Sequence, residues 1–385
     1  MAETLNMMSI TIERFVQEIK MDLEDGNYDP MIGIGLSGIG KTMSISEVAA
    51  ELGIGFCELR LVTLTETDML GIPYKDEHGR TNYASNALLP SVERDGECGI
   101  LVLDEITSAN RSVRAAAYQL LDSKRALGNY QLPPKWKVIG LGNGPDDGGV
   151  FSGMEAAFLS RCTCYRIEPD LNVWKKWAVK NEVNPSVIAF LSFMPNLLHD
   201  FDADEIASVF PCPRSWTALS TRLNAREKRT KTGILDIDQV EIYAAGSVGV
   251  KVASQFSAFY AYNGKTISAE DILDGKASVK DAANIESEVI FLVIQQLVKA
   301  IEKMFKTTPK VNGQCSLEVL TKLVNVCKWF VGISQYRLEY AVLGITDLAA
   351  ASKDFNNTII NDYRFIELYP EFIEWYINQD LEKIE

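Results

Sequence analysis

The sequence is poor in the residues that stabilise disulfide-rich and metal-bound proteins. It has seven cysteines, an odd number scattered over 385 residues, and only two histidines, His78 and His199. Scattered cysteines in odd number do not form the pattern of a disulfide framework. Cys162 and Cys164 lie close together but have no neighbouring histidine or further cysteine with which to bind a metal. These shortages argue against a disulfide scaffold and against a cysteine-bound metal.

Long apolar segments and excess positive charge are also missing. The most apolar run, residues 289–294, is far shorter than the roughly 20 residues of a membrane-spanning helix. The first residues contain neither the basic segment nor the apolar core of a signal peptide. The formal net charge of −14 disfavours binding to anionic membranes or nucleic acid, except through a local basic face. We therefore expect a cytoplasmic protein without a membrane partner.

What the sequence does contain is a glycine-rich loop between an apolar segment and a helical pattern. The apolar segment covers residues 31–34, and the loop reads Gly35-Leu36-Ser37-Gly38-Ile39-Gly40-Lys41-Thr42. Apolar residues then recur at helical spacing as far as Leu52, and Gly53 ends the pattern. A strand, a G-x-x-x-x-G-K-[ST] loop and a helix in this order predict a phosphate-binding loop. The alternative is a glycine-rich turn that matches the motif by accident.

The parts of this loop have different predicted roles. Glycines let the backbone curl so that several N–H groups point at one spot, where the helix N-terminus adds partial positive charge. Lys41 would contact the β- and γ-phosphates, and the Thr42 hydroxyl would bind Mg²⁺. The predicted cofactor-binding residues are Gly35, Ser37, Gly38, Ile39, Gly40, Lys41, Thr42 and Met43.

A second apolar segment ends in two acidic residues. Residues 99–103 are apolar enough for a strand buried on both faces of a parallel sheet, and Asp104 and Glu105 follow. Ligands bind beyond the C-terminal ends of such strands. We therefore expect Asp104 to bind Mg²⁺ and Glu105 to polarise the attacking water. The alternative is a pair of acids that simply leaves a strand into solvent.

A third strand pattern and two hairpins complete the expected sheet region. Residues 136–142 form the strand pattern, and Asn143 at its end is placed to orient the lytic water. One hairpin is expected at about residues 71–84, where a plain surface loop is the alternative. The other turns at residues 128–129, Gly-Asn.

The rest of the chain has helical patterns. Arg214 lies near a helix start, where a cation is more natural if it points at an anion such as a phosphate. The basic run at 222–231 suits the other end of that helix, with nucleic-acid contact as the alternative. An apolar stripe from Ile290 to Phe305 predicts a core seam, with a cofactor or partner groove as the alternative. Helices are expected over residues 5–24, 173–180, 185–193, 213–229, 236–262, 284–306, 316–332, 336–351 and 357–377.

Together these motifs resemble the AAA+ ATPases, most closely the MoxR-like and dynein-related branch. The resemblance covers roughly residues 30–230 and includes the order of the motifs and the two hairpins. It implies an α/β fold, namely an αβα sandwich with a five-stranded parallel sheet, followed by a helical lid and an all-helical extension. The expected domains are residues 1–170, 171–277 and 278–385. The extension matches no part of the family pattern.

The resemblance also implies roles for single residues. Asn143 would be sensor 1, Arg161 the arginine finger and Arg214 sensor 2, and with Glu105 they form the predicted catalytic set. Two segments depart from the family pattern: Ser-Arg-Cys at 160–162 replaces Asp-Arg-Phe, and Gly-Leu-Gly-Asn ends the Asn143 strand in place of Ala-Thr-X-Asn. Neither departure removes a charged catalytic group, so only the rate is in question.

A finger far from the phosphate loop in sequence implies a ring, usually of six subunits, in which Arg161 completes the neighbour's site. We expect a ring-forming ATPase that uses ATP and Mg²⁺ to remodel or mature a protein partner. The first expectation is a partner with a von Willebrand factor A-type domain. The alternatives are a motor or loader acting on nucleic acid and a nucleotide-controlled assembly scaffold. The choice of ATP over GTP comes from the resemblance alone.

Overall fold

The computed structural model describes residues 7–84, 86–144, 159–201, 209–263, 267–279, 286–308 and 314–379. These residues form two compact units, each described here by itself. The first unit contains the described residues up to Val173, with Phe201 and Cys212–Arg214. The second contains Trp174–Asp200, Val209–Pro211 and the described residues from Ser215 onward.

The first unit is built on a parallel sheet. In spatial order its strands are β1 (Met8–Thr11), β10 (Thr163–Glu168), β2 (Met31–Gly35), β9 (Lys135–Gly142), β6 (Cys98–Asp104) and β3 (Gly55–Arg60). The predicted α/β fold with a parallel sheet is confirmed, but the sheet has six strands where five were expected.

The additional strand lies where the sequence predicted the start of a helix. Strand β1 pairs with β10, and helix α1 (Ile12–Glu24) begins directly after it. The Thr11 side chain accepts a hydrogen bond from the Arg14 backbone N–H and caps the helix there. The predicted helix from residue 5 is therefore wrong in its first part, because a four-residue strand has too short a pattern to be separated from the adjoining helix.

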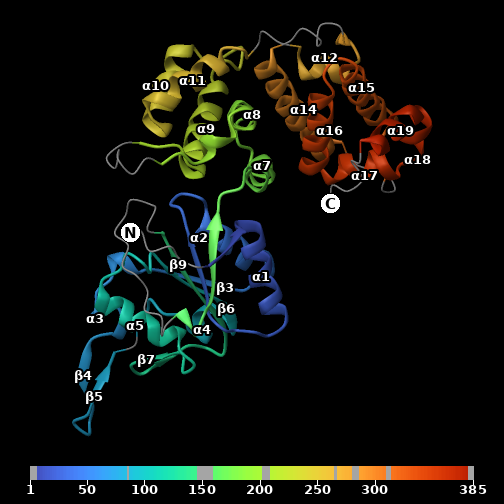
Figure 1. The fold of residues 1–385 in the computed structure, drawn as a ribbon. Coiled ribbons are helices and arrows are strands. Elements are labelled where there is room, and N and C mark those ends of the chain that lie inside the picture. Colours follow the sequence, from blue (N-terminus) through green and yellow to red (C-terminus); the bar gives the residue numbers. More distant parts are fainter. Residues whose placement is uncertain are drawn as a thin grey trace. The chain divides into compact units, whose positions relative to one another are not determined.

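Helices cover both faces of this sheet (Figure 1). On one face, α1 and α2 (Lys41–Leu52) bring Phe15 and Ile45 into a core with the strand residues Ile100 and Val102. On the other face, α3 (Glu66–Leu70) and α5 (Arg111–Leu121) pack over the alternate strand residues. Strand β6 is thus buried on both sides, as its unbroken apolar run predicts. The short helices η1 (Leu61–Thr63) and α4 (Val92–Asp95) also belong to this unit.

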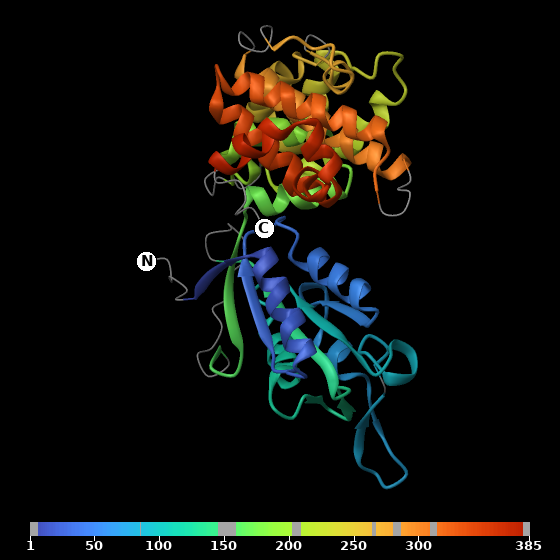
Figure 2. The same cartoon turned by 90° about the vertical axis from the view of Figure 1, so that its right-hand side faces the viewer.

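Both expected hairpins are present. The first consists of β4 (Pro73–Lys75) and β5 (Thr81–Tyr83) and extends away from the sheet (Figure 2). In its turn, the Asp76 carboxylate accepts hydrogen bonds from the backbone N–H groups of His78 and Arg80. The second hairpin consists of β7 (Ala126–Leu127) and β8 (Tyr130–Gln131).

The two hairpins contact each other. The Asn129 side-chain amide donates to Oδ1 of Asn82, at 3.0 Å. The second hairpin therefore supports the first at Asn82 of β5.

The second unit is helical. It contains α7 (Leu171–Lys180), α8 (Pro185–Phe193), η3 (Pro195–Leu198), α9 (Pro213–Glu227), α10 (Ile237–Val248), α11 (Val250–Tyr260), α12 (Ala269–Leu273), α14 (Ser287–Thr307), α15 (Leu317–Ser334), α16 (Leu338–Ala351), α17 (Lys353–Asn361), α18 (Tyr363–Leu368) and α19 (Pro370–Asn378). The first residues of α7 and α9 belong to the first unit.

Two of the predicted helices are divided. The one expected over 236–262 is broken at Gly249, whose φ of 91° is outside the helical region. The one expected over 357–377 is broken where Asp362 caps α18 and Pro370 begins α19. In both places the sequence contains a helix-breaking residue, Gly249 or Pro370. The apolar periodicity on each side of it nevertheless predicted one continuous helix.

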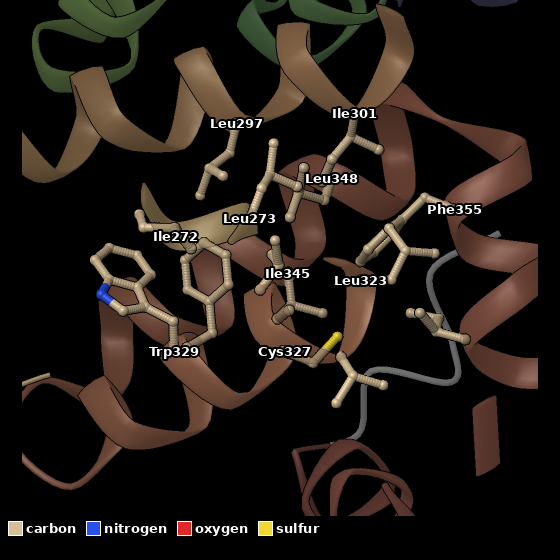
Figure 3. Close-up of a cluster of buried hydrophobic side chains, with 14 of the residues drawn as sticks. Ile272, Leu273, Leu297, Ile301, Leu323, Cys327, Trp329, Ile345, Leu348 and Phe355 are labelled. Carbon is tan, nitrogen blue, oxygen red and sulfur yellow. The ribbon is translucent and has the colours of Figure 1, made fainter. Parts of the chain in front are cut away.

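A large apolar core joins α12 and the helices from α14 to α19 (Figure 3). Ile290, Leu297 and Ile301 of the predicted stripe are buried in it, so the stripe is a core seam as predicted. Ile272 and Leu273 of α12 belong to the same core. Helices on both sides of residue 277 therefore share one core, and the expected division into lid and extension stays a prediction.

A largely buried ion pair reinforces this unit. Nζ of Lys175 in α7 donates to both carboxylate oxygens of Asp347 in α16, each at 2.7 Å. The buried Gln295 amide of α14 donates to the same carboxylate at 2.8 Å.

Among the described residues, no helix has the length and apolarity to cross a membrane. The cytoplasmic location stays a prediction.

Candidate functional site at the phosphate loop

Glycines shape the loop between β2 and α2. A Cβ atom on Gly35 would overlap the carbonyl oxygen of Ile167, and one on Gly38 would lie 2.7 Å from Sγ of Cys212. Gly38 and Gly40 have φ values of 76° and 94°, which L-residues with side chains rarely adopt. Glycine is therefore required at these three positions by close approach, by backbone conformation, or by both.

The loop ends at the N-terminus of α2. Gly40 is the N-cap residue and supplies no side-chain cap, and Lys41, Thr42 and Met43 form the first helical turn. A helix N-terminus carries partial positive charge from its backbone N–H groups. The loop and the N-terminus of α2 together therefore form a site suited to an anion.

Lys41 joins the loop to the strand that ends in Asn143. Its side chain is buried, and Nζ donates to the carbonyl oxygens of Gly35 at 2.6 Å and Leu36 at 2.8 Å. Nζ also donates to Oδ1 of Asn143 at 3.2 Å. Lys41 and Asn143 were predicted from separate motifs, and the structure brings them together.

Thr42 meets the first of the two acidic residues. Its Oγ1 donates to Oδ2 of Asp104 at 3.0 Å, and Oδ1 of Asp104 accepts from the Glu105 backbone N–H at 2.9 Å. Mg²⁺ is usually bound by one or two carboxylates together with substrate phosphates and waters. A hydroxyl and a carboxylate at this spacing, beside a phosphate loop, fit that donor set.

Glu105 has an unusual backbone conformation. Its φ is 57°, in the left-handed region that costs a non-glycine residue energy and is enriched at functional sites. The following residues fold back toward β9, and the Ile106 backbone N–H donates to the Leu141 carbonyl at 2.9 Å. Glu105 is therefore held at the turn, next to Asp104 and at the same edge of the sheet as Asn143.

Thr107 is a site residue that the sequence analysis did not identify. It is fully buried, and its Oγ1 accepts from the Asn143 backbone N–H at 3.0 Å and donates to the Asn143 carbonyl at 3.1 Å. A hydroxyl two residues after the acidic pair was the available signal. Thr107 belongs to no motif with a fixed spacing, because its partner Asn143 is 36 residues away in the sequence.

Arg214 lies beside the phosphate loop. Its backbone N–H donates to the Gly38 carbonyl at 3.0 Å, and its Cβ would lie 3.6 Å from a Cβ built on Gly38. Arg214 is exposed, whereas Cys212, two residues earlier, is buried against the loop. The structure thus brings the predicted sensor 2 residue to the loop.

Arg161 is not brought to the loop of its own chain. It lies two residues before Thr163, which pairs with Met31 at the opposite end of β2 from Gly35. β2 has five residues, so its two ends lie four residue steps, or about 13 Å, apart. The Arg161 side chain is 57% exposed, with Nε 3.8 Å from Oδ1 of Asp122.

A parallel sheet covered on both faces, with a glycine loop and helix N-terminus at the end of β2, defines a P-loop nucleotide-binding fold. Residues 30–162 match the family model of the AAA domain, dynein-related subfamily. This part of the chain is an AAA+ domain of that branch, as the sequence resemblance predicted. The family in general consists of nucleotide-hydrolysing ATPases that use ATP and Mg²⁺.

Individual relatives are distant. Midasin of Giardia intestinalis is 27% identical over 139 residues, which are 34% of this chain and 3% of midasin. This chain therefore matches only a small part of that protein. Among solved structures, a point mutant of Thermotoga maritima RuvB is 15% identical with a TM-score of 0.35, over 82% of this chain and 95% of that one. The Thermotoga maritima RuvB Holliday junction branch migration motor is 14% identical with a TM-score of 0.32, over 87% of each chain.

Proposed function

We propose that the chain is a Mg²⁺-dependent ATPase that works as a ring and acts on a protein partner. One observation carries the ATPase part: Lys41, the Thr42–Asp104 pair and Asn143 converge at one edge of the sheet. These side chains come from three separate strand ends, and each is of the type that nucleotide hydrolysis requires.

In this proposal each residue has a defined task. Lys41 binds the β- and γ-phosphates, while Thr42 and Asp104 hold Mg²⁺, which neutralises charge on the transferred group when bound. Glu105 accepts a proton from the attacking water, and Asn143 orients that water. Arg214, beside Gly38, contacts the nucleotide.

The position of Arg161 supports action between subunits. It is exposed and lies at the end of β2 remote from the phosphate loop. An arginine there serves a γ-phosphate only if that phosphate is bound by another copy of the chain. We propose a ring, most simply a hexamer, in which Arg161 completes the neighbouring site.

The proposed partner is a protein, with a von Willebrand factor A-type domain as the first candidate. The exposed apolar side chains of Ile72 and Tyr74 on the first hairpin support protein contact. The acidic net charge disfavours nucleic acid as the partner. A MoxR-like remodelling role is the form of this proposal that the sequence resemblance favours.

The test is phosphate release by the purified chain, measured with Mg²⁺–ATP, with EDTA, and with a candidate partner protein. We expect Mg²⁺-dependent turnover that the partner increases. Turnover increased by DNA, with DNA binding that weakens as salt rises, would instead indicate a nucleic-acid motor. Very slow turnover that no partner changes would indicate an assembly scaffold.

A further inference from the structure

One buried hydroxyl connects the strand end of Glu105 with the strand end of Asn143. Oγ1 of Thr107 accepts from the Asn143 N–H at 3.0 Å and donates to the Asn143 carbonyl at 3.1 Å. A threonine hydroxyl has one donor and two acceptor positions, so its donor is committed to Asn143. The Thr107 side chain is fully buried, so water does not compete for these bonds.

Gly142, which precedes Asn143, has no side chain and so leaves space for the Thr107 hydroxyl. A Cβ atom on Gly142 would lie 2.7 Å from both Cγ2 and Oγ1 of Thr107. The Ile106 N–H also donates to the Leu141 carbonyl at 2.9 Å. Residues 106–107 are therefore fixed to residues 141–143 by one backbone bond, one close packing contact and a reciprocal hydroxyl bond.

These contacts complete a closed chain of interactions around the candidate site. Asn143 accepts from Lys41, which is followed by Thr42, and Thr42 donates to Asp104. Asp104 accepts from the backbone of Glu105, which lies two residues before Thr107. A shift of Thr107 would therefore change the position of the water-orienting amide relative to the water-activating carboxylate.

We propose that Thr107 is a positioning residue for ATP hydrolysis: through the Asn143 backbone it holds the Asn143 amide in register with Glu105. This inference rests on the proposed ATPase function. Thr107→Val keeps the side-chain shape but leaves the Asn143 N–H and carbonyl without these bonds. Thr107→Ser keeps the hydroxyl, and Gly142→Ala would displace the hydroxyl without removing it.

The first test compares kcat, KM and ATP affinity of these variants. Because a misplacement of about 1 Å can cost about 10²-fold in rate, we expect Thr107→Val and Gly142→Ala to lower kcat by about 10–100-fold. Their ATP affinity should stay close to that of the unmodified chain, since Lys41 and the loop are unchanged. Thr107→Ser should retain most of kcat.

The matched control is Thr358→Val. Thr358 is also buried and donates to a carbonyl, that of Asp354, but it lies in the helical unit. We expect this variant to lose stability without losing kcat. If Thr107→Val and Thr107→Ser had the same kcat, or if Thr107→Val lost ATP affinity in proportion to kcat, the positioning role would be refuted.

A second measurement does not depend on hydrolysis. Hydrogen exchange at the Asn143 N–H should become faster in Thr107→Val and remain slow in Thr107→Ser. Unchanged exchange in Thr107→Val would refute the proposed hold on Asn143, whatever the activity. An inactive unmodified chain whose Asn143 N–H nevertheless depends on Thr107 would refute the ATPase proposal while leaving this contact established.

Discussion

Two lysines of the first unit are buried, Lys41 in the first turn of α2 and Lys137 on β9, and their surroundings differ. Lys41, at the C-terminal edge, donates to two backbone carbonyls and the Asn143 amide oxygen. Lys137, on β9 toward the other edge, donates to the Asp22 carboxylate at 2.8 Å and to the Asp29 carbonyl at 2.7 Å. Burial lowers the pKa of Lys137, while the bond to Asp22 acts in the opposite direction.

The difference separates the two ends of the parallel strands. We call the C-terminal ends, where Lys41 lies, the binding edge, and the N-terminal ends, near Lys137, the structural edge. Phosphate oxygens can take the place of neutral oxygens around Lys41, since an anion is the stronger acceptor for an ammonium group. Lys137 donates to the Asp22 carboxylate and lies near the start of β9, remote from the phosphate loop. The comparison predicts that changes at the C-terminal edge alter nucleotide chemistry, whereas changes at the other edge alter stability.

Arg161 is the proposed exception to this division, and it carries the largest expected effect. It lies near the structural edge, yet we expect Arg161→Ala to lower kcat by about 10³–10⁵-fold, or about 4–7 kcal/mol, as for arginine fingers of other P-loop enzymes. ATP binding should remain nearly intact. The exposed Arg14, paired with Glu18 in α1, provides a control that should keep its turnover when changed to alanine.

Mixing tests whether Arg161 acts across subunits. Lys41→Ala should be inactive for a different reason, so the two inactive proteins together can form sites with one intact loop and one intact Arg161. ATPase activity should return and rise with total protein concentration. A mixture that co-assembles but stays inactive would place Arg161 outside the neighbour's site.

Lys137 provides the stability side of the comparison. Lys137→Met should lower the free energy of unfolding by about 3 kcal/mol, at the low end of the range for breaking a buried ion pair, because Asp22 keeps some access to water. Lys135→Met on the same strand removes only an exposed pair with Glu97 and should cost at most about 1 kcal/mol. Chemical denaturation measures both. Equal stability of the two variants, or lost ATP affinity in Lys137→Met, would contradict the division.

The first hairpin should have the smallest effect on the chemistry itself. Replacing residues 74–83 by a short Gly-Ser link removes nearly all of the hairpin and its contact with Asn129. Because this segment lies outside the site, basal ATPase should be unchanged while stimulation by the protein partner is lost. Circular dichroism and ATP titration check folding; loss of the folded chain would show that the hairpin is structural.

Local motifs predicted most of this arrangement from the sequence. The loop at 35–42, the acids after β6 and Asn143 after β9 each follow an apolar strand, and parallel strands bring their C-terminal ends together. Thr107 was not predictable in the same way. Its role depends on a partner on another strand and on the space left by Gly142, and neither leaves a periodic pattern.

In the helical unit, too, contacts between residues far apart in the sequence could not be predicted from local patterns. Its apolar stripes predicted helices and a core seam, but not that α12 and α14 share that core. Lys175 and Asp347 form a largely buried pair across 172 residues of sequence. Such pairings depend on how helices pack, which the periodicity of single helices does not specify.

The most direct test of the account is a calorimetric titration of Mg²⁺–ATP into two variants of the binding edge. Lys41→Ala removes the charge that the account assigns to the phosphates, whereas Glu105→Gln removes only the base that activates water. We therefore predict that Glu105→Gln binds ATP with nearly unchanged affinity and that Lys41→Ala does not bind it measurably. Equal loss of affinity in both variants would contradict the division of roles at this edge of the sheet.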